Sequence, residues 1–260
     1  MQRIVMFSGG AGSWATAKRV KERHPGDPLV LVFADTKAED PDLYRFLQDS
    51  AANLDARLVW LQDGRDLWEV FRDKRFIGNS RLANCSHLLK QKPAREWLEA
   101  NVQPDDAVIY VGIDWTETHR LASIVEAYKP YRAEAPLTEP PFMDKAAVLE
   151  WMRREGIEPP RLYALGFAHN NCGGFCVRAG QAQFKRLLEV FPERYAYHEA
   201  QEESMRQMLD RDVSILSEQR QGHKVPLTLR SFRERQESQP GLFDADDWGG
   251  CGCFVDSVSH

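Results

Sequence analysis

Short apolar runs alternate with amphipathic stretches through the first half of this chain, and no other feature limits its possible folds as strongly. The apolar runs have the length and composition of buried strands, and the stretches between them have helical periodicity. Strands that are apolar on both sides need cover on both faces, which a parallel sheet wrapped by helices provides. The pattern therefore predicts an α/β fold with a doubly wound parallel sheet. The expected strands are Arg3–Phe7, Leu29–Ala34, Arg57–Leu61 and Ala107–Gly112.

The second half of the chain has helical patterns and few strand-like runs. A stretch rich in proline and acid, Ala133–Pro141, predicts a connection between the two halves. We therefore expect a core at residues 1–142 and a helical C-terminal extension at residues 143–260. From Arg211 onward the chain becomes polar. The expected helices are Trp14–Arg23, Pro41–Asp55, Leu67–Phe71, Pro93–Asn101, Asp144–Glu155, Gln181–Phe191, Tyr195–Leu209 and Leu229–Glu237, with Pro192 between the sixth and the seventh.

The charge of the chain limits its partners. A formal net charge of −5 argues against a protein that coats nucleic acid without specificity. The stretch from Arg65 to Arg95 is different, because it holds eight basic residues and three acidic ones. Such a stretch can bind a phosphate-rich partner such as nucleic acid, and it can equally be a solvated face.

The cysteines indicate the compartment and a possible metal site. No apolar run is long enough for a membrane helix, and the first residues do not resemble a signal peptide, so we expect a cytoplasmic protein with reduced thiols and no membrane partner. Five cysteines in such a protein favour metal or redox chemistry over disulfides. Four thiolates can hold zinc or an iron–sulfur cluster, and His87 and His169 are admissible zinc ligands. Core packing of Cys85, with Cys172 and Cys176 paired only by chance, is the alternative.

The loop Ser8-Gly9-Gly10-Ala11-Gly12-Ser13 lies between an expected strand and an expected helix. Its glycines allow the backbone to approach an anion, and the helix that follows presents free N–H groups and the positive end of its dipole. The spacing is neither that of an ordinary P-loop nor that of a dinucleotide-binding loop. The loop therefore predicts a phosphate site of another type, with a tight turn that binds nothing as the alternative.

Five motifs in chain order carry a family resemblance. They are the loop Ser8–Ser13, then Ala34-Asp35-Thr36, then Cys85 with Lys90 and Pro93, then Gly112-Ile113-Asp114 with Glu117 and Arg120, and finally Leu162-Tyr163 with Gly166-Phe167 followed by Cys172 and Cys176. Together they resemble the motifs of phosphoadenylyl-sulfate (PAPS) reductases and N-type ATP pyrophosphatases, in a style similar to iron–sulfur sulfurtransferases that modify nucleic acids.

The resemblance implies a fold, a ligand and a reaction. The fold is the adenine nucleotide alpha-hydrolase-like one, and the ligand is ATP, or another adenine nucleotide, with Mg²⁺. The implied reaction is adenylation of a nucleic-acid or nucleotide acceptor followed by sulfur transfer, with a sulfur-donor protein as a partner and the stretch Arg65–Arg95 holding the acceptor. The implied nucleotide-binding residues are Ser8, Gly9, Gly10, Gly12, Ser13, Ala34, Asp35, Thr36, Gly112, Glu117 and Arg120.

For the cysteines, the resemblance implies a [4Fe-4S] cluster, with zinc as the alternative. The implied ligands are Cys85, Cys172, Cys176 and Cys251. Cys251 and Cys253 of the tail are also the candidate catalytic thiols, since one of five thiols is left over for attack or for carrying sulfur.

The sequence also departs from the family pattern. Gly12 stands where pyrophosphatases have an aspartate, which makes ATP cleavage uncertain, and Asp114 stands where the family usually has an arginine. Two alternatives therefore stay open. One is a PAPS or adenylyl-sulfate reductase with Cys251 as the nucleophile, and the other is a non-catalytic adenine-nucleotide sensor or binding module.

Overall fold

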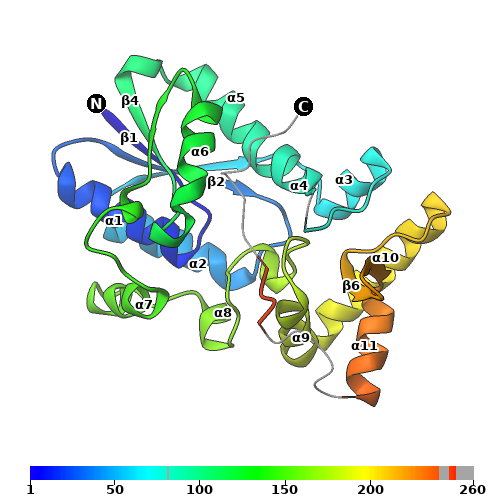
Figure 1. Ribbon diagram of the computed structural model, residues 1–260. Coiled ribbons are helices and arrows are strands. Elements are labelled where there is room, and N and C mark those ends of the chain that lie inside the picture. The colour runs from blue at the N-terminus through cyan, green and yellow to red at the C-terminus, as the bar shows by residue number, and fades with distance from the viewer. Residues whose placement is uncertain (81, 240–245, 250–260) are drawn as a thin grey trace.

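A five-stranded parallel sheet forms the centre of the computed structural model, which describes residues 1–80, 82–239 and 246–249 (Figure 1). The strand order is β3-β2-β1-β4-β5, so the chain winds outward from β1 in one direction and then in the other. The predicted doubly wound α/β fold is confirmed. The strands are β1 (Gln2–Met6), β2 (Leu29–Asp35), β3 (Arg57–Gln62), β4 (Ala107–Tyr110) and β5 (Arg132–Glu134).

Helices cover both faces of this sheet. Val5 and Phe7 belong to a buried cluster with α1, α2 and α7, whereas Ile4 and Met6 belong to a second cluster with α5 and α6. Neighbouring residues of a strand point to opposite faces, which is why β1 is apolar throughout. The helices of this part are α1 (Ala11–Arg23), α2 (Pro41–Asn53), α3 (Leu67–Lys74), α4 (Asn84–Ser86), α5 (Lys92–Asn101), α6 (Leu121–Tyr128) and α7 (Lys145–Arg154).

The structure adds two elements to the expected core. Strand β5 lies where we expected part of the connection between the halves, and α6 follows the Gly112–Arg120 motif. Three residues, of which Arg132 and Glu134 are charged, are too short and too polar to be recognised as a strand. The segment with Cys85 is also helical, since α4, a π-helical turn η1 (His87–Gln91) and α5 follow one another directly. Short 3₁₀ turns are η2 (Pro104–Asp106), η3 (Trp115–Arg120), η4 (Pro136–Thr138) and η5 (Cys172–Gly174).

Apart from α7, which packs on a face of the sheet, the C-terminal extension lies at one end of the sheet (Figure 1). Its helices agree with the expectation, and Pro192 begins α10. The polar region after Arg211 contains an antiparallel hairpin that we did not expect, because only Leu216 and Leu227 of its strands are buried. The domain boundary at residue 142 stays a prediction. The elements are α8 (Arg161–Ala164), α9 (Gln181–Val190), α10 (Pro192–Leu209), β6 (Leu216–Arg220), β7 (His223–Leu227) and α11 (Leu229–Ser238).

None of the helices in the described ranges combines the length and apolarity that crossing a bilayer requires.

A buried carboxylate joins the hairpin to α10. Glu202 is 1% exposed, and its two oxygens accept hydrogen bonds from the backbone N–H groups of Ile215 (2.9 Å), just before β6, and Leu229 (2.6 Å), just after β7, at the open end of the hairpin. Burial raises the pKa of Glu202 to about 7, although the two N–H donors oppose that change.

This carboxylate predicts a pH-dependent stability. Between about pH 4.5 and 7 the folded protein holds a proton that the unfolded chain has released, so the free energy of unfolding falls as pH rises through that window. We expect Glu202 to lower the free energy of unfolding by about 3 kcal/mol across this window. Glu202→Gln should remove this part of the pH dependence in urea unfolding, at a constant cost of about 1–3 kcal/mol for one lost acceptor. The neighbouring substitution Glu203→Gln should leave the dependence unchanged. An identical slope in wild type and Glu202→Gln would contradict the assignment.

Candidate functional site

A cavity of about 390 Å³ opens at the carboxyl ends of β1 and β4, the neighbouring strands from which the chain winds in opposite directions. In doubly wound sheets this is where ligands bind. The predicted residues that line it are Ser8, Gly10, Gly12, Ser13, Gly112 and Glu117. The structure thus brings together the loop after β1 and the motif after β4, which are about a hundred residues apart in the chain.

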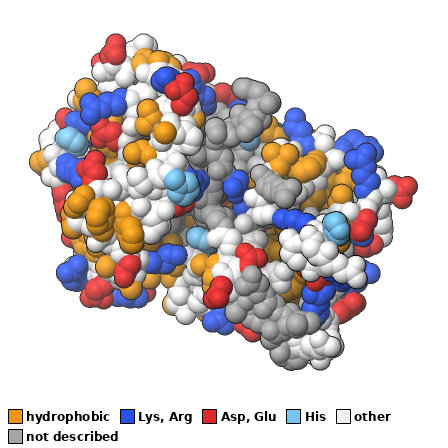
Figure 2. Space-filling view, in the orientation of Figure 1, with side chains coloured by type: hydrophobic (Ala, Val, Ile, Leu, Met, Phe, Trp, Pro, Cys, Tyr) orange, Lys and Arg blue, Asp and Glu red, His pale blue; other side chains and the backbone are white. Residues whose placement is uncertain are grey.

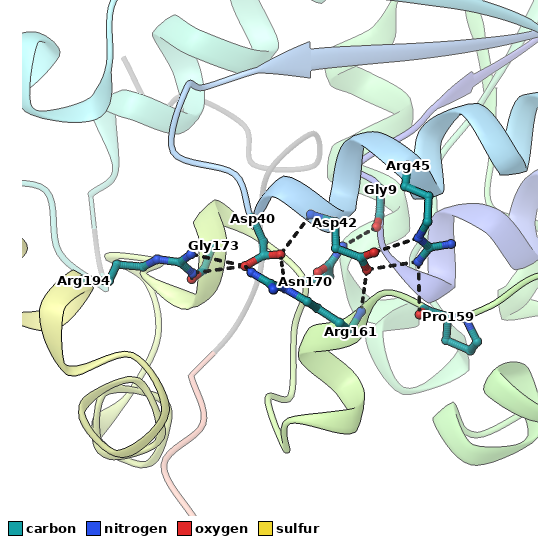
Figure 3. Close-up of polar contacts among 9 residues, drawn as sticks. All are labelled: Gly9, Asp40, Asp42, Arg45, Pro159, Arg161, Asn170, Gly173 and Arg194. Carbon is teal, nitrogen blue, oxygen red and sulfur yellow. Dashed lines mark hydrogen bonds and ion pairs between the residues drawn. The ribbon is translucent and has the colours of Figure 1, made fainter.

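The loop after β1 is held in one conformation by the rest of the chain. Gly9 has φ +75°, and a Cβ there would lie 2.7 Å from Leu43 Cδ1, so only glycine suits the position. Its carbonyl accepts a hydrogen bond from Asn170 Nδ2 at 2.8 Å (Figure 3). Ser13 Oγ donates to the Gly10 carbonyl (2.8 Å) and accepts from the Gly10 N–H (3.2 Å). Gly9 therefore shapes the loop and does not line the cavity.

Tyr163 caps the first turn of α1. Its hydroxyl accepts a hydrogen bond from the Ala11 N–H at 3.0 Å and lies 3.3 Å from where a Cβ on Gly10 would be. The ammonium of Lys145 lies 5.9 Å from the centre of its ring. Both side chains line the cavity. The motif Leu162-Tyr163 contained this residue, but nothing in the sequence indicated that it meets the glycine loop.

The two halves of the cavity touch at Gly12 and Gly112. A Cβ on Gly12 would lie 3.2 Å from the Gly112 carbonyl oxygen, and a Cβ on Gly112 would lie 3.0 Å from the Ser13 nitrogen. A distance of 3.0 Å is about the shortest that a real Cβ atom keeps from another heavy atom. The approach of these two backbones gives a physical reason for glycine at position 12, where the family has an aspartate.

Carboxylates supply most of the charge in the cavity. Asp114 Oδ1 caps η3 by accepting from the Thr116 N–H at 2.8 Å, and Asp144 Oδ1 caps α7 by accepting from the Ala147 N–H at 2.8 Å. Glu117 forms an ion pair with Arg120, which itself does not line the cavity. Each cap uses one carboxylate oxygen, so a second oxygen of Asp114 and of Asp144 is available for a cation.

His169 also lines the cavity. Burial, followed by the nearby charge of Lys145, lowers the pKa of His169 to about 4, so the ring is neutral at pH 7. Its neighbour Asn170 is 2% exposed and holds the glycine loop, as described above. Residues 168–171 thus form one wall of the cavity, although the sequence indicated only a possible zinc ligand there.

Ala34, Asp35 and Thr36 do not line this cavity. Asp35 is buried and accepts hydrogen bonds from the Lys37 N–H (2.8 Å) and the Tyr44 hydroxyl (3.2 Å). Burial and the charge of Asp35 raise the pKa of Tyr44 to about 12. Contact between Ala34-Asp35-Thr36 and a nucleoside therefore stays a prediction, while the loop after β2 has a structural role that is clear.

Glu39 of that loop is the centre of a buried polar network. Its Oε1 accepts from the Thr36 hydroxyl (3.0 Å) and lies 3.3 Å from the Lys90 ammonium. Its Oε2 accepts from the Cys172 N–H at 2.6 Å. Lys90 is 3% exposed. A full charge is stable at such depth only when it is paired, so Lys90 and Glu39 depend on each other.

Cys85, Cys172 and Cys176 line a second, smaller cavity, together with Thr36 and Lys90. No disulfide joins the three cysteines. Neither His87 nor His169 lines this cavity. Among the residues that the structure describes, no three His, Cys, Asp or Glu side chains lie close enough to share a metal ion. The predicted cluster therefore stays a prediction, and its fourth ligand, Cys251, lies outside the described residues, as does Cys253.

Asp40, the residue after Glu39, anchors the C-terminal extension (Figure 3). Its side chain is fully buried and forms ion pairs with Arg161 (2.7 Å) and Arg194 (3.3 Å). It also caps α2 through the Asp42 N–H. Burial opposes ionisation, but the hydrogen bond from Arg161, the Asp42 N–H and both cations hold the pKa of Asp40 below its usual value. The carboxylate therefore stays ionised at neutral pH.

The contact between Gly12 and Gly112 predicts a sensitive position. Gly112→Ala should force α1 away from the loop after β4, because the new methyl group meets backbone that cannot rotate aside. We expect a loss of about 1–3 kcal/mol of stability and at least tenfold weaker nucleotide binding by calorimetry. Gly26→Ala is the matched control, since a Cβ there meets nothing within 4 Å. Wild-type stability and affinity in Gly112→Ala would show that the contact is not tight.

Comparisons with known proteins give likenesses of fold. No protein-family model matches the sequence, and no curated protein matches it. A PAPS reductase from Candida auris, solved as a phosphate complex, has a TM-score of 0.45 and 18% identity over 63% of this chain and 78% of its own. The U34-tRNA thiolase NcsA from Methanococcus maripaludis, solved with its [4Fe-4S] cluster, has a TM-score of 0.45 and 11% identity over 81% of this chain and 71% of its own.

An NH3-dependent NAD synthetase from Campylobacter jejuni has a TM-score of 0.39 and 11% identity over 80% of this chain and 82% of its own. At these values the likeness does not tell what this chain binds, and function has to follow from its own side chains. The chain is an α/β protein with a doubly wound parallel sheet.

Proposed function

We propose that this protein is an enzyme of adenine-nucleotide-dependent sulfur chemistry. ATP binds in the cavity on the Ser8–Ser13 loop, an oxygen of the acceptor is adenylated, and sulfur then replaces that oxygen. One observation carries the proposal: the consecutive residues Asn171 and Cys172 line the two cavities, so the site for a nucleotide adjoins the site with three thiols.

The phosphates belong at the glycine loop. The first turn of α1 leaves amide N–H groups without partners inside the helix, and the helix dipole favours an anion there. Ser8 and Ser13 add hydroxyl groups. Asp114, Glu117 and Asp144 would repel the phosphates unless a cation lay between them. Mg²⁺ fits this arrangement, because it usually takes one or two carboxylates together with substrate phosphates. Asp114 and Asp144 are the proposed ligands.

The reaction consists of two displacements. In the first, the acceptor oxygen attacks the α-phosphate of ATP and pyrophosphate leaves. In the second, a sulfur nucleophile attacks the acceptor atom that bears the adenylated oxygen, and AMP leaves with that oxygen. With hydrosulfide as the sulfur source, the exchange releases a proton and needs no reductant. A sulfur-donor protein is the proposed partner, and Cys251 and Cys253 are the proposed carriers of sulfur. When the donor supplies sulfane sulfur, Cys251 would carry it as a persulfide, and attack by the Cys253 thiolate would release hydrosulfide and form a Cys251–Cys253 disulfide, which an external thiol reductant would then reduce.

An iron–sulfur cluster fits the donor chemistry of the second cavity. Three thiols line it, and thiolates are the ligands that such clusters and zinc prefer. A bound cluster would supply an iron site for sulfur only while its fourth thiolate, proposed to be that of Cys251, is not bound to that iron. Cys85, Cys172 and Cys176 would hold it with Cys251.

Two alternatives remain. The close contact of Gly12 with Gly112 leaves little room for the loop aspartate of ATP pyrophosphatases, which favours a non-catalytic nucleotide sensor. Release of pyrophosphate from ATP, with total RNA and sulfide supplied, would separate the enzyme from the sensor. A PAPS or adenylyl-sulfate reductase with Cys251 as the nucleophile would instead release sulfite in a thioredoxin-dependent reaction.

The proposed metal ligand can be tested without knowing the acceptor. We expect wild type to bind ATP at least tenfold more tightly with Mg²⁺ than with EDTA in calorimetry. Asp114→Asn should lose most of this difference, because the amide keeps the cap on η3 but carries no charge for the cation. Asp105→Asn, in η2, is the control and should behave as wild type. If Asp114→Asn responds to Mg²⁺ as wild type does, the metal is held in another way.

The thiols predict a coloured protein. Protein purified without oxygen should absorb visible light and contain iron and sulfide. Cys172→Ser should bleach it, while Cys253→Ser should leave most of the colour. Zinc, or no metal at all, in the anaerobic wild type would refute the cluster, and the ATP measurement above would be unaffected by that result.

A further inference from the structure

The basic stretch Arg65–Arg95 does not form one continuous surface. Arg65 is paired with Asp63 (2.6 Å) and Asp73 (2.7 Å). Arg95 is paired with Glu99 at 2.6 Å and also donates to the Lys129 carbonyl. Lys90 is buried beside Glu39. These three of the eight basic residues in this stretch are therefore paired with carboxylates, and Lys90 is the buried one of the three.

Arg75 is different, because it lines a groove of about 350 Å³ with two cations from the C-terminal extension. Arg211 follows α10, and Lys224 lies on β7. All three side chains are exposed. The acidic residue in this groove, Asp212, forms an ion pair with Arg206 at 2.9 Å. Within the described ranges the structure shows no ion pair for Arg75, Arg211 or Lys224.

The three cations come from segments that are far apart in the chain. Arg75 ends α3 in the left-handed conformation, with φ +49°, which directs the chain into the groove wall at Phe76–Ser80. The β6–β7 hairpin forms the opposite wall. Basic side chains gather at this end of the molecule, over α3 and the far end of α10 (Figures 1 and 2). Like charges that are not paired repel one another, so a groove of this kind gains most from an anionic ligand.

The other side chains in the groove favour one class of anion. Phe76 is half-buried there, and Ser80 and Ser217 provide hydroxyl groups. Arginine, lysine and serine are the side chains that contact phosphate groups, and a partly exposed ring can stack on a base. Acidic peptides would use the cations but not the ring.

We propose that this groove binds the phosphodiester backbone of a single-stranded nucleic acid. As the docking surface of the acceptor the groove rests on the proposed function, but its binding can be measured without ATP. It lies on the side of the molecule formed by α3 and the hairpin, and it shares no lining residue with the nucleotide cavity. The acceptor would thus be held by its backbone at a distance from the atom that reacts.

The test is fluorescence anisotropy with a labelled 20-nucleotide oligo(U). The triple variant Arg75→Gln/Arg211→Gln/Lys224→Gln should raise the Kd at least tenfold. The slope of log K against log salt should become shallower by about 2, which corresponds to three lost contacts with single-stranded phosphate. The control Arg57→Gln/Lys129→Gln/Arg132→Gln removes the same charge at the amino ends of β3 and β5, and it should bind as wild type does.

Four outcomes would overturn the inference. The first is equal weakening by the control triple, which would indicate net charge alone. The second is wild-type binding of the oligonucleotide by the groove triple. The third is poly-glutamate binding that is as tight as that of the oligonucleotide and as sensitive to the groove triple, which would indicate an acidic protein partner. Gly10→Val separates the two sites: it should abolish ATP binding and leave oligonucleotide binding intact. Loss of ATP binding in the groove triple, with normal stability, would also contradict separate sites.

Discussion

The rest of the structure depends on two adjacent buried carboxylates in the loop after β2. Glu39 holds the Lys90 ammonium and the backbone of Cys172, and Asp40 holds the guanidinium groups of Arg161 and Arg194. Removing one partner of a buried pair leaves an uncompensated charge, which costs far more than the pair contributes. These contacts therefore couple the position of the C-terminal extension to the carboxyl edge of the sheet. The thiol-lined cavity exists because that docking brings Cys172 and Cys176 to Cys85.

A second constraint acts on the other side of β1, where Gly12 and Gly112 bring two loops into backbone contact. That contact leaves a cavity in which the glycine loop faces carboxylates from the opposite side. Under the proposed function, a nucleotide fits this arrangement only when a cation lies between its phosphates and the carboxylates. Gly12 and Asp114, the two residues that depart from the motifs, line the same cavity. The loop itself has no carboxylate, and Asp114 supplies one from across the cavity.

Local patterns were enough to predict the strands β1 to β4, most of the helices and the glycine loop, because burial on both faces and helical periodicity depend on residues that are close in the sequence. Strand β5 and the β6–β7 hairpin could not be predicted in this way. Arg132–Glu134 forms a strand only because β4 provides a pairing partner, and the hairpin buries little more than Leu216 and Leu227. For the basic stretch Arg65–Arg95 the sequence left two readings open, because a run of like charges does not show which acids lie opposite it.

By itself, the sequence determined the fold class, the place of the Ser8–Ser13 glycine loop between a strand and a helix, and the identity of the thiols, since these follow from composition and spacing over a few residues. Tertiary structure alone decided which side chains meet. It placed Tyr163 on the first turn of α1 and Asn170 on Gly9, and it gathered Arg75, Arg211 and Lys224 into one groove. It also moved Lys90 from a supposed surface patch into the core, where Glu39 neutralises it. The physical reason is that charge and hydrogen-bond partners act through space at a few ångströms, across any distance in the chain.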